Sequence, residues 1–307
     1  MNYETLYNSI QAYAENTEAL FVANIPVFVQ EAEDRIYNTV QIPALRKNVT
    51  GTLTLGNKYV SLPDDWLSNY SLAVIDASGN YTYLLNKDVN FIREAYPSPT
   101  KRGLPRYYAL FGSQYTDINE MSLILGPTPD SNYSVEMHYY YYPPTIVQGQ
   151  ISLLNTASFS GGSLYANGVY QNVALTGGSG SGAYADIVVS GGSVTSVTLK
   201  FGGNFYVVGD SLSASSSTIG SSGTGFTISV SAVSNSKGTS WLGDNYDPVL
   251  LYGAMREAML FMKGEADLVT YYEQKYSEAM QQLNRLGTGL ERGDAYRDGQ
   301  ARIQVNP

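Results

Sequence analysis

The 307-residue sequence predicts an α+β fold, in which a helical bundle formed by N- and C-terminal helices accompanies a central antiparallel β section and an inserted small all-β domain. Three observations support this prediction. Apolar residues recur at helical spacing in the first forty residues and again after residue 247. Short apolar runs separated by turn residues fill residues 48–145. Residues 158–234 hold 15 of the 30 glycines and only three charged side chains.

Two helices are expected at the N-terminus. Leu6 and Ile10 mark the apolar face of the first. The second is expected to begin at Asn24-Ile25-Pro26, because proline is tolerated in the first turn of a helix. Its apolar face then includes Phe28 and Ile36, and Pro43 closes this section.

Two more helices are expected near the C-terminus. Asp247 is the predicted N-cap of the first, which ends at Gly264, and the second runs from about residue 266 to 286 with Gly287 as its stop. Residues 288–307 show no apolar periodicity and are expected to form an extended C-terminal tail. Because each helix has one apolar face to bury, the terminal pairs are expected to pack together. The predicted core domain combines residues 1–150 and 238–287.

The central section is expected to contain strands at 52–55 and 59–62, joined as a hairpin by a turn at Gly56-Asn57. Further strands are predicted at 71–75, 107–111, 121–125 and 133–142. The glycine-rich stretch could be a flexible linker, but residues 185–189 and 194–199 flank a two-residue turn at Gly191-Gly192 and so predict a hairpin. Residues 158–234 are therefore interpreted as a folded all-β insertion.

No catalytic residue, cofactor site or metal site is predicted, and the chain is expected not to be an enzyme. Cysteine is absent, which excludes disulfides, thiol nucleophiles and sulfur-ligated zinc. The only histidine, His138, alternates along a strand with Glu136, Tyr140 and Tyr142. Glu136 and His138 could form an acid/base pair or half of a metal site. A half-exposed strand at a subunit contact is the favoured interpretation, because no second imidazole completes such a site.

Charge and hydropathy limit the kinds of partner that are expected for the chain. The net charge is −9 and no cluster of Lys or Arg is present, so specific DNA binding is not expected. The N-terminus lacks the features of a signal peptide, and no apolar run approaches the roughly 20 residues that span a bilayer, so a soluble protein made in the cytoplasm is expected. The 27 tyrosines suit interfaces that are partly apolar and partly wet, as in an assembly subunit or a sugar-binding surface.

Two motifs stand out along the chain: Ile25-Pro26-Val27-Phe28 with the Ala32-Glu33…Arg35-Ile36 that follows, and Leu62-Pro63-Asp64-Asp65-Trp66-Leu67 after a strand. Further segments follow in order: 103–110, 123–130, the Tyr-rich strand before Pro143-Pro144, 240–242 and 247–254. Each motif alone is weak, but together and in this order they resemble a known family, the head-to-tail adaptor (connector) proteins of short-tailed bacteriophages. The resemblance spans about residues 1–147 and 238–307, and residues 158–234 depart from it as a Gly/Ser-rich β module.

The resemblance implies a structural virion protein, located at the connector between head and tail and made in the host cytoplasm. It implies a homo-oligomeric ring, usually a dodecamer, that contacts the portal protein and the tail nozzle or hub protein. DNA is expected to pass through the ring without specific binding during ejection, along a wall where acidic side chains outnumber basic ones. The sequence leaves open whether tail fibres are a further partner. The C-terminal segment commonly reaches toward the portal, which assigns portal contact to Arg292, Tyr296, Arg297, Arg302, Ile303 and Val305.

The alternative function is a carbohydrate-binding or host-contact tail protein that acts through the β insertion. Aromatic side chains there could form a sugar-stacking patch, although core packing or subunit contact is the favoured interpretation of the same residues. These side chains are Phe159, Tyr165, Tyr170, Tyr184 and Tyr206. A tail-associated hydrolase is a third candidate, but the paired carboxylates Asp64 and Asp65 are more simply explained by a turn or a helix cap.

Overall fold

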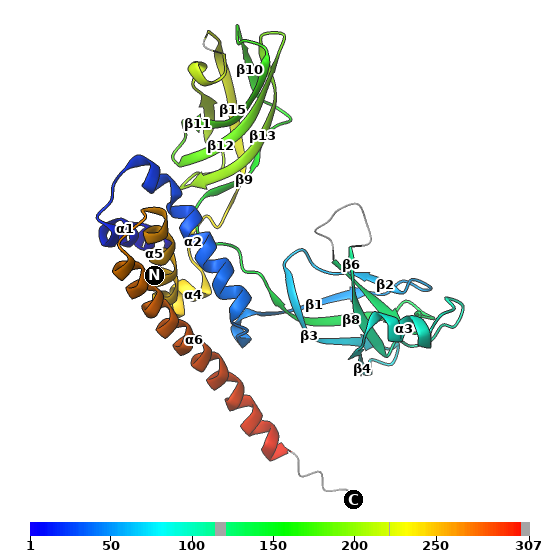
Figure 1. The fold of residues 1–307 in the computed structure, drawn as a ribbon. Coiled ribbons are helices and arrows are strands. Elements are labelled where there is room, and N and C mark those ends of the chain that lie inside the picture. The colour runs from blue at the N-terminus through cyan, green and yellow to red at the C-terminus, as the bar shows by residue number, and fades with distance from the viewer. Residues whose placement is uncertain (114–120, 221, 302–307) are drawn as a thin grey trace, which may run out of the picture. The chain divides into compact units, whose positions relative to one another are not determined.

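The computed structural model describes residues 1–113, 121–220 and 222–301, and side chains as far as residue 287. It confirms the α+β class, with helices and mainly antiparallel sheets (Figure 1). The chain divides into two compact units. Unit 1 comprises residues 1–40 and 144–307, and unit 2 comprises residues 41–143.

Unit 1 contains a helical bundle in which α5 is the central member. Helix α5 packs against α1, α2 and α6, which confirms that the N- and C-terminal helices pack together. Ile10, Phe28 and Met255 are among the side chains buried in the bundle. The helices of this unit are α1 (Tyr3–Ala14), α2 (Ala19–Thr39), α4 (Trp241–Asn245), α5 (Asp247–Phe261) and α6 (Ala266–Ala301).

Gly253 on α5 lies against both α2 and α6, the other two of the three longest helices. A Cβ atom at this position would lie 2.9 Å from the Ala32 Cβ and 3.2 Å from the ring of Tyr276. Both neighbours are buried, so neither side chain can move into solvent. The absence of a side chain at Gly253 therefore allows α2, α5 and α6 to meet.

Replacement of Gly253 by valine is expected to lower the free energy of unfolding by about 1–3 kcal/mol, because the branched side chain overpacks this crossing. Urea denaturation measures the effect. Ser277→Val is the matched control, since Ser277 is exposed on α6 and the substitution there costs only a few tenths of a kcal/mol in helix propensity. Equal losses in the two variants would contradict the role given to Gly253.

Helix α2 begins earlier than predicted. It starts at Ala19, so Pro26 lies inside the helix, where its missing N–H leaves the Val22 carbonyl without its usual donor. Burial of Phe21 explains the difference. Its ring packs against Phe28 and Phe261, with centroids 5.7 and 6.4 Å apart. The proline signal for a helix start was therefore overridden by apolar contacts one turn upstream.

The boundaries of α5 and α6 also differ from the prediction. Asp247 is the first residue of α5 and not its cap, and Lys263, with φ of 53°, takes the left-handed conformation expected at Gly264. The predicted stop at Gly287 and extended tail from residue 288 are wrong as far as residue 301, because α6 continues to Ala301. A glycine inside a helix costs only about 1 kcal/mol, and no proline occurs between Gly287 and Pro307.

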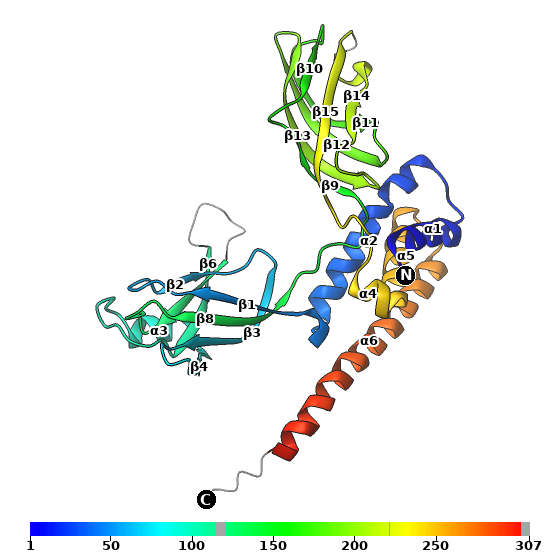
Figure 2. The same cartoon turned by 180° about the vertical axis from the view of Figure 1, so that it is seen from behind.

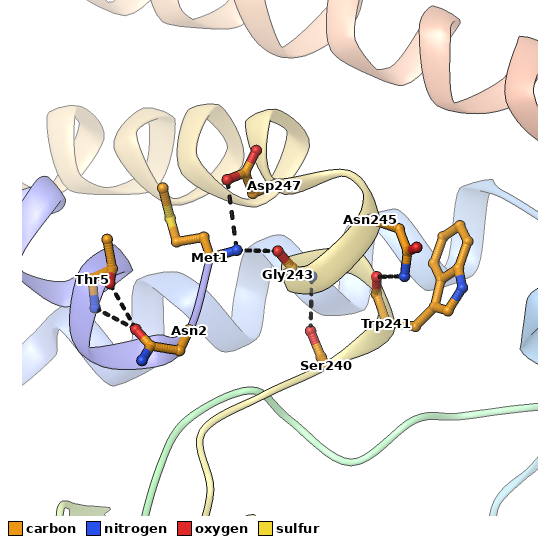
Figure 3. A network of polar contacts seen from close by, with 8 residues as sticks. All are labelled: Met1, Asn2, Thr5, Ser240, Trp241, Gly243, Asn245 and Asp247. Carbon is orange, nitrogen blue, oxygen red and sulfur yellow. Dashed lines mark hydrogen bonds and ion pairs between the residues drawn. The ribbon is translucent and has the colours of Figure 1, made fainter.

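Helix α1 is fixed at its start by polar contacts with the segment that precedes α5 (Figure 3). The Asn2 side chain accepts hydrogen bonds from the Thr5 backbone N–H and hydroxyl, at 2.9 and 2.7 Å, and so caps α1. The amino group of Met1 donates to the Gly243 carbonyl and lies 3.7 Å from the Asp247 carboxylate. Residues far apart in the chain therefore meet at the start of the bundle.

Unit 2 is built from two four-stranded sheets that enclose a shared core. Leu72, Val74, Leu123 and Met137 lie in this core. The strand orders are β1-β8-β3-β4 and β2-β7-β6-β5. The elements are η1 (Pro43–Leu45), β1 (Arg46–Thr52), β2 (Tyr59–Ser61), β3 (Trp66–Ile75), β4 (Tyr81–Tyr83), β5 (Leu85–Asn86), α3 (Val89–Ala95), β6 (Tyr107–Ser113), β7 (Met121–Gly126) and β8 (Ser134–Tyr141).

The strands predicted at 71–75, 107–111 and 121–125 are confirmed as parts of β3, β6 and β7, and the strand predicted at 133–142 is confirmed as β8, which is one residue shorter at each end. The predicted hairpin around Gly56-Asn57 is wrong. Strand β1 pairs with β8, and β2 pairs with β7 in the other sheet. Leu53 and Leu62 are both buried in the shared core, so the connection crosses from one sheet to the other while burying the same apolar residues.

The glycine-rich segment folds as a curled seven-stranded sheet with its own apolar core, as predicted. Its path is β10-β15-β14-β11-β12-β13, and β9 pairs with β15. Figures 1 and 2 show β13 and β9 side by side. The strands are β9 (Gln150–Leu154), β10 (Ser160–Ser163), β11 (Gly168–Thr176), β12 (Ser181–Ser190), β13 (Ser193–Asn204), β14 (Ser211–Ala214) and β15 (Thr224–Ser234), and η2 (Ser216–Thr218) precedes the last of these.

Two features of this sheet follow directly from glycine. The predicted hairpin is confirmed, because Ser190 pairs with Ser193 across Gly191 and Gly192, whose φ angles of 63° and 79° suit a type I′ turn. At Gly202 a Cβ atom would lie 2.3 Å from the Ile151 carbonyl oxygen, so only glycine allows β13 to approach β9. The sheet therefore begins at β9, ahead of the change in composition near residue 158.

The β insertion is packed onto helix α1. The Tyr3 ring is fully buried and lies 5.2 Å from the ring of Phe205, at the end of β13. Asn204, also buried, donates a hydrogen bond of 3.0 Å from Nδ2 to the Tyr3 hydroxyl. Gln30 on α2 adds a 3.0 Å hydrogen bond to Gln150 at the start of β9. The insertion is thus joined to the helices by buried contacts as well as by its two connections.

A buried carboxylate binds the chain segment that enters the insertion, which in turn contacts the segment that leaves it. Glu33 on α2 accepts hydrogen bonds from the Thr145 hydroxyl at 2.6 Å and the Ile146 backbone N–H at 2.8 Å. Asn235, at the exit of the insertion, donates to the Thr145 carbonyl at 2.8 Å. Burial raises the pKa of Glu33 to about 7, although these two hydrogen bonds oppose the rise.

Candidate interaction surfaces

The outer face of the first sheet in unit 2 is rich in tyrosine. The Arg46 guanidinium carbon lies 3.8 Å from the Tyr70 ring centroid, and its Nη2 donates a 2.7 Å hydrogen bond to the Tyr140 hydroxyl. Tyr81 and Tyr83 on β4 are exposed, and their rings stack with centroids 6.4 Å apart. We call this surface, comprising Arg46, Tyr70, Tyr81, Tyr83, Glu136, His138 and Tyr140, the tyrosine face.

His138 and Glu136 lie on the tyrosine face, as their alternation predicts. Each has an aromatic partner: His138 packs edge-on against Tyr70 at 5.1 Å, and Glu136 accepts a 3.3 Å hydrogen bond from the Tyr81 hydroxyl. Tyr142 lies beyond the end of β8. Among the described residues no group of three or more His, Asp or Glu side chains could hold a metal ion. This environment favours a contact surface over a reaction site.

Of the adjacent carboxylates Asp64 and Asp65, the second is held by two neighbouring strands. Asp65 accepts hydrogen bonds from Lys47 Nζ at 2.5 Å and from the Tyr139 hydroxyl at 2.8 Å. Partial burial tends to raise the pKa of Asp65, but these two donors outweigh it and the pKa is lowered. Asp65 therefore remains ionised and links β1 to β8.

The insertion does not present the proposed set of tyrosines on one surface. Tyr165 and Tyr206 are buried in the core of the sheet. The Tyr165 hydroxyl accepts a 3.2 Å hydrogen bond from the Phe226 backbone N–H. Tyr170 and Tyr184 are half-buried, and Tyr170 donates to the Ala166 carbonyl at 2.9 Å. Phe159 packs against the same core. Core packing therefore explains Tyr165 and Tyr206, and a stacking patch built on them is not supported.

The residues assigned to portal contact fall in two groups. Arg292, Tyr296 and Arg297 belong to α6, where the structure gives the backbone path and not the side chains. Arg302, Ile303 and Val305 lie outside the described residues. At 1.5 Å per residue, the 36-residue α6 is roughly 54 Å long, well over twice the length of α5.

One end of the helical bundle exposes an apolar cluster that the sequence analysis missed. The α1–α2 and α5–α6 turns meet there, with Asn16 Nδ2 3.3 Å from the Met262 sulfur. Six large apolar side chains around these turns are exposed, and four carboxylates lie among them. We call this surface the helix-end patch; it comprises Tyr13, Leu20, Leu260, Phe261, Leu268 and Tyr271 with Glu15, Glu18, Glu265 and Asp267.

A second surface, on unit 2, places cations against aromatic rings. Tyr107 and Phe111 alternate on one face of β6, beside α3. Lys58 Nζ lies 5.4 Å from the Tyr59 ring centroid and Arg93 Cζ lies 5.2 Å from that of Phe111, and the two rings are 5.1 Å apart. Lys87 Nζ lies 5.6 Å from the Phe91 ring centroid. We call Lys58, Tyr59, Lys87, Phe91, Arg93, Tyr107 and Phe111 the cation–aromatic face.

Sequence reasoning missed these two surfaces for different reasons. The helix-end patch combines side chains from four helix ends, and each looked like an ordinary end of an amphipathic helix. The cation–aromatic face depends on α3, a seven-residue helix that no periodic pattern predicted. The one available signal was the frequency of Lys and Arg between residues 46 and 106, which carries all eight basic residues of unit 2.

Within the described part of the chain, no helix combines the length and the apolar character that crossing a membrane requires. The model of a protein family described as SU10 adaptor protein matches residues 1–175. The match covers the N-terminal helices, all of unit 2 and the first strands of the insertion, and so more than half of the chain. No curated protein matches the chain.

Proposed function

Because the chain belongs to the SU10 adaptor protein family, a family of phage head-to-tail adaptors, we propose that it forms the adaptor ring that connects the portal to the tail nozzle. In this function the protein is structural and non-enzymatic, and its ring encloses part of the DNA channel. The observation that carries the proposal is the family match over residues 1–175.

The fold supports an assembly function in two ways. Several exposed surfaces carry large apolar or aromatic side chains, among them the tyrosine face and the helix-end patch, and such surfaces commonly mark protein interfaces. Identical chains that contact each other head to tail form a closed ring when the rotation between them closes. A ring would bury surfaces that a single copy leaves in water.

The charge of the chain suits a DNA channel. With 27 acidic and 18 basic residues, the chain repels phosphate overall. We extend the proposal to a channel wall on which acidic side chains outnumber basic ones, so that DNA passes without specific binding. An assembled ring that retains double-stranded DNA at low salt would contradict this part of the proposal.

The portal contact is assigned to the C-terminal segment. Deletion of residues 288–307 is expected to abolish binding of the assembled ring to the portal protein of the same phage while leaving unit 2 and the bundle intact. The masses of the full-length and shortened chains, alone and mixed with purified portal, measure this. Portal binding that is unchanged by the deletion would show that the contact lies elsewhere.

A point substitution separates a specific contact from the loss of a whole segment. Arg292→Ser combined with Arg297→Ser is expected to weaken portal binding, because arginine pairs well with carboxylates at interfaces. Arg285→Ser is the matched control, since Arg285 is exposed on the part of α6 that precedes the deleted segment. Equal weakening by the control would contradict the assignment.

A further inference from the structure

The helix-end patch has the composition of a protein-binding surface. Leu20 is 67% exposed and Tyr271 is 50% exposed, although both residues lie next to buried members of the bundle. Exposed apolar groups that gather in one place, rimmed by charge, commonly mark an interaction site. Phe261 shows how the patch is supported, since its ring packs against Phe28 at 5.2 Å while 41% of the residue stays exposed.

The patch is negatively charged. Glu15 and Glu18 flank the α1–α2 turn, and Glu265 and Asp267 flank the α5–α6 turn. All four are exposed, and within the described residues none of their carboxylates has an ion-pair partner. Two cations lie nearby: Lys263 in the α5–α6 turn, and Lys275, which is 5.9 Å from the Tyr271 ring centroid and pairs with Glu278 at 3.1 Å. The carboxylates outnumber them, so a complementary partner is apolar and basic.

The cation–aromatic face has this complementary composition. Its rings form two pairs, Tyr59 with Phe111, and Phe91 with Tyr107, whose ring centroids lie 5.4 Å apart edge-on. Tyr59, Tyr107 and Phe111 pack against one small apolar cluster. Within the described residues Lys58, Lys87 and Arg93 make no ion pair, although each lies beside a ring. Helix α3 and its cap carry two carboxylates, Glu94 and Asp88, the second of which accepts a 2.7 Å hydrogen bond from the Asn90 backbone N–H, so three cations stand against two carboxylates here.

The net charges of the two units also differ, and unit 1, which carries the acidic patch, is the more negative. Unit 1 has 18 acidic and ten basic residues, whereas unit 2 has nine and eight, which together make the 27 and 18 of the whole chain. Almost all of the net charge of −9 therefore belongs to the unit that carries the helix-end patch. Contact between unlike units lowers electrostatic repulsion between copies more than contact between like units.

We infer that the helix-end patch of one copy binds the cation–aromatic face of a second copy of this chain. The contact joins two different surfaces, so each copy uses its patch on one neighbour and its face on the other, as a closed ring requires. The inference rests on the proposed ring and assigns the surfaces that close it. Apolar side chains meet aromatic rings at its centre, and carboxylates meet Lys and Arg at its rim.

Charge reversal tests the contact in purified chains. The patch variant is Glu15→Lys with Glu265→Lys, and the face variant is Lys58→Glu with Arg93→Glu. Each is expected to lose the assembled species at a protein concentration where the unchanged chain is fully assembled, because like charges then oppose each other across the contact. An equimolar mixture of the two variants is expected to assemble again, with patch and face variants alternating around the ring. Native mass spectrometry measures all three samples.

The controls show whether a loss of assembly comes from the two surfaces, from charge reversal anywhere on the chain, or from a loss of folding. Glu4→Lys with Glu31→Lys reverses two exposed carboxylates on α1 and α2 outside the patch, and Lys101→Glu reverses an exposed cation of unit 2 outside the face. Both controls are expected to assemble normally. All variants are checked for unchanged urea unfolding as separate chains, so that a loss of assembly reports on the contact.

The outcomes are distinct. Patch and face variants that each assemble like the unchanged chain overturn the inference and leave the ring itself standing. If the four substitutions placed together in one chain restore assembly but the mixture of variants does not, the two surfaces meet within a single chain, which also overturns it. An unchanged chain that stays monomeric at every concentration, with and without portal, overturns the proposed ring as well.

Discussion

Replacement of Tyr3 by alanine is expected to lower the free energy of unfolding by about 3–5 kcal/mol, which is typical of removing a large buried aromatic side chain. Tyr3 is fully buried between α1 and the β insertion, in contact with Phe205 and hydrogen-bonded to Asn204. Its loss leaves a cavity and a buried amide without its acceptor. Urea denaturation measures the loss, and limited proteolysis within residues 158–234 reports whether the insertion is released.

Tyr3→Phe separates the two contributions. It keeps the ring and removes only the hydroxyl, so the expected cost is that of one unsatisfied buried amide, about 1–3 kcal/mol. Tyr83→Ala is the matched control, because Tyr83 is 66% exposed and such surface substitutions usually change stability by no more than about 0.5 kcal/mol. If Tyr3→Ala resembled the control, the insertion would not depend on this contact for its attachment.

Glu33→Gln is expected to remove a pH dependence of stability between about pH 4.5 and 7. The pKa of Glu33 rises from 4.5 to about 7 in the folded chain, because burial disfavours the ionised carboxylate. In this window the folded chain holds a proton that the unfolded chain releases. The stabilising effect is therefore complete below pH 4.5 and is lost as the pH rises through 7, by roughly 3 kcal/mol in total.

The measurement is the free energy of unfolding at intervals from pH 4 to pH 8.5 for both chains. The difference between them isolates Glu33, because the other titrating groups are shared. The glutamine carbonyl can still accept from the Ile146 N–H, and the neutral amide carries no charge to bury. Glu31→Gln is the control, since Glu31 is exposed on α2. Parallel curves for the original chain and Glu33→Gln would show that the Glu33 carboxylate is not buried as the structure places it.

The fold class could be predicted from the sequence because the patterns that indicate it involve only residues close together in the chain. Helical spacing found α1, α5 and the start of α6, and the turn at Gly191-Gly192 found the hairpin of β12 and β13. The boundaries failed where distant contacts decide them. Proline at position 26 is a good start signal, but the ring of Phe21 packs against Phe261, which lies 240 residues away in the chain.

Strand pairing was the less predictable part of unit 2. The segments around Gly56 have the apolar alternation and the turn of a hairpin, yet β1 and β2 pair with β8 and β7. A hairpin and a crossing between two sheets bury Leu53 and Leu62 equally well. The choice between them is made by β7 and β8, which lie more than sixty residues further along the chain, and no local pattern reports it.

The interaction surfaces were predictable only in part. Alternation correctly placed Glu136 and His138 on one strand face, because the period of a strand is fixed by its backbone. The aromatic residues of the insertion were harder to assign. Tyr165 and Tyr170 have similar neighbours in the sequence, yet one is buried and the other half-buried. Which side of a curled sheet becomes its interior depends on how the sheet closes.

The length of α6 has a mechanical consequence. The first half of α6 packs against the bundle as far as Leu283, which is fully buried. The remaining 18 residues, 284–301, continue for roughly 27 Å beyond this packed part. A rotation of about 5° where the packing ends moves the far end of the helix by roughly 2 Å. A change in the packing around Gly253 and Tyr276 is therefore carried along the stiff helix to its end.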